Sequence, residues 1–130
     1  TLENIWSFSD KETEEIHDFI QIVFPLNKPS QSAFHGYYLD NRDLVNEIKN
    51  NKKAITNIIK SSEWFFSFLK RNTYWNAPYD HNQLRITRVI ECLRLLVSDE
   101  AADNFHKNVL ELIQNNNRVS ARTLNFWKNA

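Results

Sequence analysis

The sequence predicts an all-α protein, a single irregular bundle of five to six helices that forms one domain over residues 1–130. Apolar residues recur at helical spacing in several stretches, and the short β-branched runs fall in helical registers. One glycine and three prolines occur in 130 residues, whereas sandwiches and barrels need many turns, which usually bring glycine. Apolar residues make up 42% of the chain. A chain of this length buries roughly two-thirds of its extended-chain surface on folding, so these residues can form a hydrophobic core.

The first predicted helix begins at a capping box and ends at a proline. Ser9 and Glu12 have the spacing at which each side chain satisfies a free backbone amide of the first turn. Apolar residues then recur at helical spacing from Ile16 to Phe24, and Pro25 stops the helix because it lacks an amide hydrogen. We therefore expect one continuous helix between Ser9 and Phe24.

Residues 25–39 are predicted to form an ordered loop. The segment contains prolines and the only glycine, Gly36, but it also carries aromatic residues that should pack back on the core. These core-facing residues of the loop are Phe34, Tyr37, Tyr38 and Leu39.

The rest of the chain is predicted to form further helices. Asp40 caps the second, and the third, about Lys52–Leu69, is central to the bundle. After an aromatic loop at residues 71–81, a fourth helix starts near Asn82, and Ser98 and Ser120 cap the last two. The side chains expected to face the core are Leu44, Val45, Ile48, Ile55, Ile58, Ile59, Phe65, Phe66, Leu69, Ile86, Val89, Ile90, Leu93, Leu96, Val97, Ala102, Phe105, Val109, Leu112, Ile113, Leu124 and Trp127.

The overall charge and the cysteine count exclude some function classes. Sixteen basic residues balance sixteen acidic ones, so no global charge draws the chain to nucleic acid or to an anionic membrane. The apolar runs are far shorter than the roughly 20 residues that span a bilayer, and we expect no membrane insertion. Cys92 is the only cysteine and lies in an apolar helical stripe, which indicates a buried, inert thiol and a reducing, intracellular compartment.

A set of polar residues on the first and fourth helices forms the candidate site. His17 and Gln21 are four apart and share a helix face, and Arg85 and Arg88 are three apart on another. Because the arginine fork pairs with carboxylate or phosphate, these groups could line a pocket for an anionic or peptide ligand. The candidate ligand-binding residues are His17, Gln21, Asn82, Arg85 and Arg88.

The alternative interpretation of the same residues is an architectural network. Gln21 would satisfy loop carbonyls after Pro25, and Arg85 would pair with an acid of the first helix such as Asp18. Buried polar groups must find partners, so such a network needs no ligand.

Aromatic residues beside arginines form a candidate patch for a partner. Arg71, Tyr74 and Trp75 lie in the loop that leads into the fourth helix, where the rings could stack on a peptide or on bases. Core and rim packing is the alternative role of these rings. The second functional hypothesis is a nucleic-acid-associated module, and the neutral net charge counts against it. Its phosphate-binding residues would be Arg85, Arg88, Arg94 and Lys70 or Arg71, with Tyr74 or Trp75 stacking on bases.

No catalytic constellation, metal site or cofactor is predicted. The four histidines lack the His-x-x-x-His spacing of a helical zinc site, and one cysteine is too few for a structural one. The carboxylates of the first helix, among them Glu14, are interpreted as a solvated face that complements the helix dipole. We therefore expect a non-enzymatic binding or interaction domain with a peptide or protein partner.

Two segments carry polar as well as apolar residues in a distinctive order, residues 16–26 with Pro29 following, and residues 82–93. They resemble the conserved N-terminal region of the opioid growth factor receptor family. That family has a tryptophan before an acidic helix ending in Phe-Pro-Leu, and later a segment Asn-x-Leu-Arg-Ile-Thr-Arg. The first segment is matched by Trp6, His17, Ile20, Gln21, Phe24, Pro25 and Pro29. The second is matched by Asn82, Leu84, Arg85, Ile86, Thr87 and Arg88. The order is right and the resemblance covers roughly positions 2 to 127, although the 65–69 stretch lacks the family's glycine.

The resemblance implies a family rather than a mechanism. The animal members are named for binding an opioid pentapeptide and restraining proliferation near the nucleus, and this chain is similar to short, bacterial-type stand-alone members. The resemblance implies a cytoplasmic protein, or a nuclear one in a eukaryote, and assigns no peptide-binding residues.

Overall fold

The computed structural model describes residues 1–28 and 38–130, and the all-α prediction is confirmed within them. The structure is 71% helical, and the described residues contain no strand. The described residues form eight α-helices, of which five have seven or more residues. None of these helices is long and apolar enough to cross a membrane. The elements are α1 (Leu2–Trp6), α2 (Asp10–Glu15), α3 (Ile20–Val23), α4 (Arg42–Lys49), α5 (Lys52–Arg71), η1 (Thr73–Trp75), α6 (His81–Leu96), α7 (Asp99–Ile113) and α8 (Ala121–Asn129).

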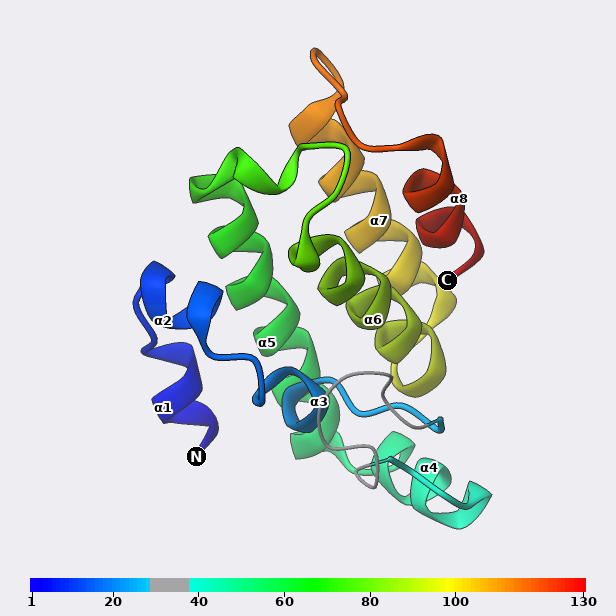
Figure 1. Ribbon diagram of the computed structural model, residues 1–130. Helices are drawn as coiled ribbons and strands as arrows, with labels where there is room; N and C mark the ends of the chain where they lie inside the picture. The colour runs from blue at the N-terminus through cyan, green and yellow to red at the C-terminus, as the bar shows by residue number, and fades with distance from the viewer. Residues whose placement is uncertain (29–37) are drawn as a thin grey trace.

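Helix α6 lies at the centre of an irregular bundle. It contacts α4, α5, α7, α8 and the one-turn helix η1, and α5 also contacts α7. Figure 1 shows α5, α6 and α7 side by side, with α8 beyond α6 and the short helices α1 to α3 on the side of α5. The amino-terminal end of α6 therefore lies between η1 and α2, and this junction holds most of the candidate site residues.

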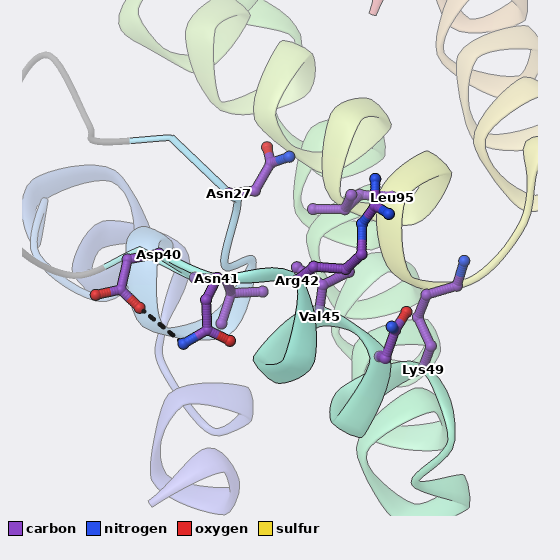
Figure 2. A pocket seen from close by; sticks show the side chains of 9 residues that line it. Asn27, Asp40, Asn41, Arg42, Val45, Lys49 and Leu95 are labelled. Carbon is purple, nitrogen blue, oxygen red and sulfur yellow. Dashed lines mark hydrogen bonds between the residues drawn. The ribbon is translucent and has the colours of Figure 1, made fainter.

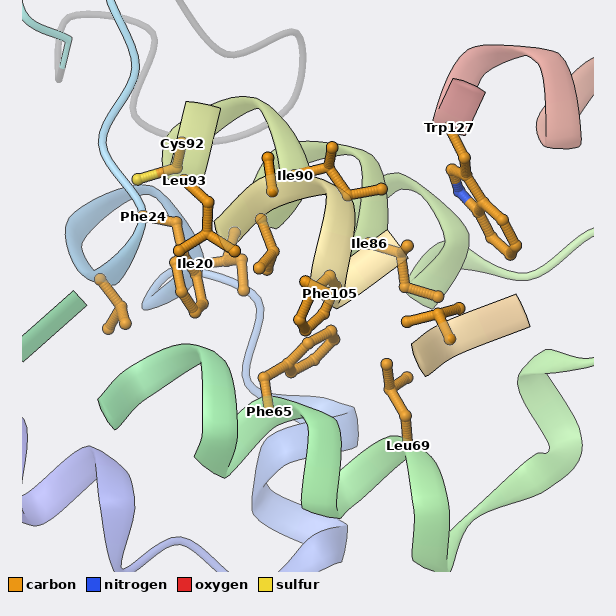
Figure 3. Packing of buried hydrophobic residues seen from close by; sticks show 14 of the residues in the cluster. Ile20, Phe24, Phe65, Leu69, Ile86, Ile90, Cys92, Leu93, Phe105 and Trp127 are labelled. Carbon is orange, nitrogen blue, oxygen red and sulfur yellow. The ribbon is translucent and has the colours of Figure 1, made fainter. Parts of the chain in front are cut away.

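The core fills the space between the long helices and takes in the short ones. Among its buried aromatic rings, Phe24 meets Phe65 edge to face at 6.4 Å between ring centroids, and Phe65 stacks on Phe68 at 5.7 Å. Most residues expected to face the core are buried, while Leu44 and Ile59 are each 38% exposed. Figure 3 shows Phe24 of the α3 end reaching the same cluster as Phe65 of α5 and Leu93 of α6.

Side-chain caps fix the start of α2, α7 and α8 at the residues that the sequence predicts. Both hydrogen bonds of the capping box are present: Ser9 N–H donates to Glu12 Oε1 at 3.0 Å, and Glu12 N–H donates to Ser9 Oγ at 3.1 Å. The Ser98 and Ser120 side chains likewise cap α7 and α8. The predicted Asp40 cap is wrong by one residue, because the Asn41 side chain accepts from the first turn of α4.

The predicted continuous first helix is wrong. Helix α2 ends at Glu15, Ile16 is extended at φ −84° and ψ 119°, and α3 begins only at Ile20. The apolar spacing continues through this region, because Phe19, Ile20 and Val23 are all buried even though the helix is broken. The break lets the two halves take different directions, and its freed carbonyls are satisfied by an arginine of α6, described below.

Predictions for part of the long loop lie outside the described residues. Pro29, Phe34, His35, Gly36 and Tyr37 belong to residues 29–37, which the structure does not describe. At its far end Leu39 is half-buried against the core, and its N–H donates to the Leu26 carbonyl at 2.7 Å. Tyr38 is 36% exposed.

Candidate functional site

Arg85 closes the carboxyl end of α2. It is 5% exposed, and its Nη1 donates to the Thr13 carbonyl at 2.7 Å and to Asn82 Oδ1 at 3.1 Å. Its Nη2 donates to the Ile16 carbonyl at 3.0 Å. The last carbonyls of a helix have no partner within it, and the arginine fork satisfies two of them across the break. Burial lowers the pKa of Arg85 and the nearby Glu14 raises it, but an arginine stays charged in proteins.

Arg88 does the same for the end of α3. Its Nε donates at 2.8 Å to the carbonyl of Phe24, which is the C-cap residue of α3. The guanidinium is half-buried, and burial lowers the pKa of Arg88. Its Nη2 is buried and makes no hydrogen bond to any residue that the structure describes. The two signature arginines, one turn apart on α6, thus each hold one half of the broken first helix.

The other polar signature residues are divided between the interior and the surface. Gln21 is 4% exposed on α3 and Asn82 is fully buried, whereas His17 is exposed. Asn82 Nδ2 donates to Glu14 Oε2 at 2.9 Å, and the side-chain oxygen Oδ1 of Asn82 accepts from Arg85. Among the five predicted residues, the contacts of Arg85, Arg88 and Asn82 are thus of the kind expected in an architectural network. Arg85 binds backbone carbonyls, however, and not the expected Asp18 carboxylate.

Glu14 links the buried network to the surface. Its Oε1 lies 3.1 Å from His81 Nε2, and its Oε2 accepts from the Tyr74 hydroxyl at 2.8 Å as well as from Asn82. Partial burial and the Glu14 carboxylate raise the pKa of Tyr74, which therefore stays protonated and keeps donating. The interpretation of Glu14 as part of a plain solvated face missed these contacts, because its partners lie about 60 or more residues away in sequence.

Two histidines meet beside this carboxylate. The rings of His17 and His81 pack edge to face, with centroids 5.3 Å apart and planes 75° apart. Asp80 caps α6 by accepting from Asn82 N–H at 2.9 Å. Ligand atoms of Glu14, Asp80 and His81 all lie within 4.8 Å of one another, so these side chains could hold a metal ion. A spacing rule within one helix could not find this set, because its members come from α2 and from the start of α6.

The predicted partner patch is only partly exposed. Trp75 is completely buried and its Nε1 donates to the Leu69 carbonyl at 2.9 Å, so it has no face for stacking. Arg71 forms a two-pronged contact with Asp10, with Nη2–Oδ1 at 2.8 Å and Nε–Oδ2 at 3.2 Å. Tyr74 is 48% exposed and Arg71 is exposed beside its aspartate, so a partner could reach these two members of the patch.

The arginines that a nucleic-acid module would use are engaged within the protein. Arg71 and Arg94 pair with aspartates on the surface, and Arg94 also donates to the carbonyl of Ala130 at 2.7 Å. Arg85 and Arg88 donate to backbone carbonyls. Binding of phosphates by these four side chains would compete with these contacts.

Large apolar side chains are exposed next to the histidines. Tyr79 precedes α6 and is 80% exposed, and Leu84 of α6 is 73% exposed. Leu84 is one helical turn from His81, so the two share a face of α6. Leu84 comes two residues before Ile86, so it lies off the apolar stripe of α6, and it is not among the residues expected to face the core.

A shallow pocket of about 420 Å³ lies elsewhere, between α4 and the end of α6. Figure 2 shows the Arg42 side chain extending toward Leu95. Lys49 lies at one end of the pocket, and Asp40 and Asn27 lie on the other side of Arg42. None of the predicted site residues lines this pocket.

Cys92 is fully buried, as expected. Burial raises the pKa of its thiol to about 12, so the reactive thiolate is scarce at neutral pH. The thiol is part of the core and does not contribute to the site.

Comparisons with known proteins leave the family open. The chain matches no protein-family model, no curated protein and no solved structure. The resemblance to the opioid growth factor receptor family therefore stays a prediction that depends on the two polar segments.

Proposed function

We propose that this chain is a non-enzymatic interaction domain that binds a basic peptide segment of a protein partner. The binding surface would be formed by Tyr74, Tyr79, His81 and Leu84 around the carboxylates Glu14 and Asp80, here called the α2–α6 surface. The observation that carries the proposal is the exposure of Tyr79 and Leu84, at 80% and 73%, beside that polar cluster.

Exposed apolar groups around a fixed polar centre are typical of a binding surface. Single exposed leucines are ordinary, but a gathered set of apolar and aromatic side chains with a polar rim marks interaction sites. Tyrosine is enriched among the residues that dominate interface energies. Here Tyr74 is held by its hydrogen bond to Glu14, so its ring is already positioned before a partner arrives.

The charge of this region favours a basic partner over an anionic one. Residues 10–18 contain five carboxylates and a single lysine, and Asp80 adds a sixth carboxylate at the surface. The anionic ligand expected from sequence depended on Arg85 and Arg88, whose donors are directed at backbone carbonyls. The proposal thus keeps the peptide of the two expected ligand classes and assigns it a positive charge.

Further features support the non-enzymatic and intracellular parts of the proposal. Cys92, the most nucleophilic side-chain type, is buried with a raised pKa. A single, buried thiol suits a reducing compartment. Membership of the opioid growth factor receptor-like family, in its short stand-alone form, is supported by the matched segments around His17 and Arg85.

Fluorescence polarisation with two peptide pools tests the proposal. One pool carries lysine, arginine and one aromatic residue, and the matched pool replaces the basic residues by glutamate. We expect the basic pool to bind and the acidic pool not to bind. Added salt should weaken the complex, because the interacting charges of the peptide and of the surface are in contact with solvent. Leu84→Ser should weaken binding, whereas Phe126→Ser, which changes an exposed ring on α8, should not. Preferential binding of the acidic pool, or equal losses in both variants, would exclude this surface.

A further inference from the structure

Three side chains able to bind a metal ion meet where α2 faces the start of α6. Glu14 comes from the last turn of α2, Asp80 is the cap of α6, and His81 is its first residue. One ligand atom from each lies within 4.8 Å of the others. This set mixes imidazole with carboxylates, and it is assembled by the tertiary fold rather than by one helix turn.

The distances suit ligands that share one small metal ion. In a tetrahedral zinc site with bonds of about 2.0–2.1 Å, two ligand atoms are about 3.3 Å apart. Glu14 Oε1 and His81 Nε2 are 3.1 Å apart. An ion could therefore enter between them with only a small movement of either side chain.

A fourth ligand is close at hand. His17 packs against His81 with ring centroids 5.3 Å apart, and two imidazoles on one tetrahedral zinc have centroids about 5 Å apart for bonds of that length. His17 is exposed and lies in the irregular segment between α2 and α3, so its side chain can rotate toward the other three ligands.

The carboxylate at the centre is held in place from behind. Tyr74 and Asn82 both donate to Glu14 Oε2, at 2.8 Å and 2.9 Å, which leaves Oε1 directed at His81. Asn82 is in turn held by Arg85. Such outer partners orient metal ligands and strengthen binding, and here they are present without any ion.

The local charges also favour a divalent cation. Glu14 and Asp80 bring two negative charges, and the buried guanidinium of Arg85 is the positive charge that acts on both of them. The site therefore carries one net negative charge. Its donors, two carboxylates and one or two imidazoles, are those that bind borderline metals such as zinc, nickel or copper rather than calcium or magnesium.

We propose that Glu14, Asp80 and His81, completed by His17, bind a divalent transition-metal ion of the zinc type. This site goes beyond the proposed peptide surface and does not depend on it, because the ligand geometry stands on its own. The ion would join α2 to α6 at the same junction that Arg85 joins from within.

Titration of the full chain, free of any histidine tag, with zinc chloride alone tests the site. Calorimetry should give one ion per chain, and cobalt substitution should give the visible absorption of a tetrahedral centre. We expect His81→Ala to weaken zinc binding by about 100-fold or more, and His17→Ala and Asp80→Asn by about 10-fold each. Asn is a good helix cap, so Asp80→Asn removes the ligand charge while keeping α6 capped.

The matched control is His106→Ala, which removes a half-buried histidine on α7. It should bind zinc as the unchanged chain does. The proposal is overturned if the unchanged chain fails to bind zinc, if His81→Ala binds it equally well, or if the control loses as much affinity. Because no peptide is present, failure here leaves the peptide proposal unaffected, and failure of peptide binding leaves this one unaffected.

Discussion

Replacing Arg85 by alanine should destabilise the protein strongly, because Arg85 holds the end of α2. The change removes three hydrogen bonds, to the Thr13 carbonyl, the Ile16 carbonyl and Asn82 Oδ1. Bonds from a charged donor contribute about 1.5–3 kcal/mol each. The contact with Ile16 is only partly buried, so water can replace it, and removing the guanidinium also relieves its desolvation. We therefore expect a net loss of about 3 kcal/mol.

That loss is large beside the total stability of a domain, which is about 5–15 kcal/mol. Urea unfolding followed by far-UV circular dichroism measures the loss in the free energy of unfolding. In thermal unfolding of the same variant, the midpoint temperature should fall by about 10 °C. Arg88→Ala loses one hydrogen bond, to the Phe24 carbonyl, and should cost about half as much. Leu84→Ala changes an exposed residue of the same helix and should stay within about 0.5 kcal/mol.

Retained stability would refute this reasoning. If Arg85→Ala unfolds within about 0.5 kcal/mol of the unchanged chain, the guanidinium is not holding the broken helix. Arg85→Lys gives a second check, because it keeps the charge and loses the planar fork that reaches two carbonyls at once. Its stability should lie between those of the alanine variant and the unchanged chain.

Three further predictions concern a core thiol, a histidine and the junction of the two proposals. Cys92, with its pKa raised to about 12, should resist iodoacetamide in the folded chain and react once urea unfolds it; equal rates in both states would contradict its burial. Burial lowers the pKa of His106 below its ordinary 6.5. The unfolded state then binds this proton more readily, so stability should fall as pH drops through 6.5, with a smaller slope for His106→Gln in pH-dependent urea titrations. Zinc should weaken binding of the basic peptide pool by neutralising Glu14 and Asp80; enhancement of binding by zinc would mean that the two sites do not share these carboxylates.

Helix positions and the core could be predicted from the sequence where local signals were strong. The capping box at Ser9 and the Ser98 and Ser120 caps are short-range patterns, and the structure contains each of them. The break after Glu15 could not be predicted in this way. The apolar spacing continues through it, and the groups that stabilise it, Arg85 and Arg88, lie 64 to 72 residues further along the chain.

The candidate site was harder to predict, because Glu14, Asp80 and Leu84 of the proposed surface were not among the site residues predicted from the sequence. The polar signature correctly indicated that residues on the first and fourth helices belong together, as the Arg85 and Asn82 contacts show. Which of them would be buried depends on how α2 meets α6, and no local pattern encodes that. The pairing of Glu14 with His81 follows from the same junction.

One nuclear magnetic resonance titration tests most directly the division between scaffold arginines and an exposed binding surface. The basic peptide pool is added to isotope-labelled protein while backbone amide and arginine Nε–H signals are followed. We predict shifts at Tyr79, His81 and Leu84, with the Arg88 Nε–H signal unchanged because it stays bonded to the Phe24 carbonyl. A large shift of the arginine signals with no change at Tyr79 and Leu84 would contradict the account, because the ligand would then be held by the groups assigned to the scaffold.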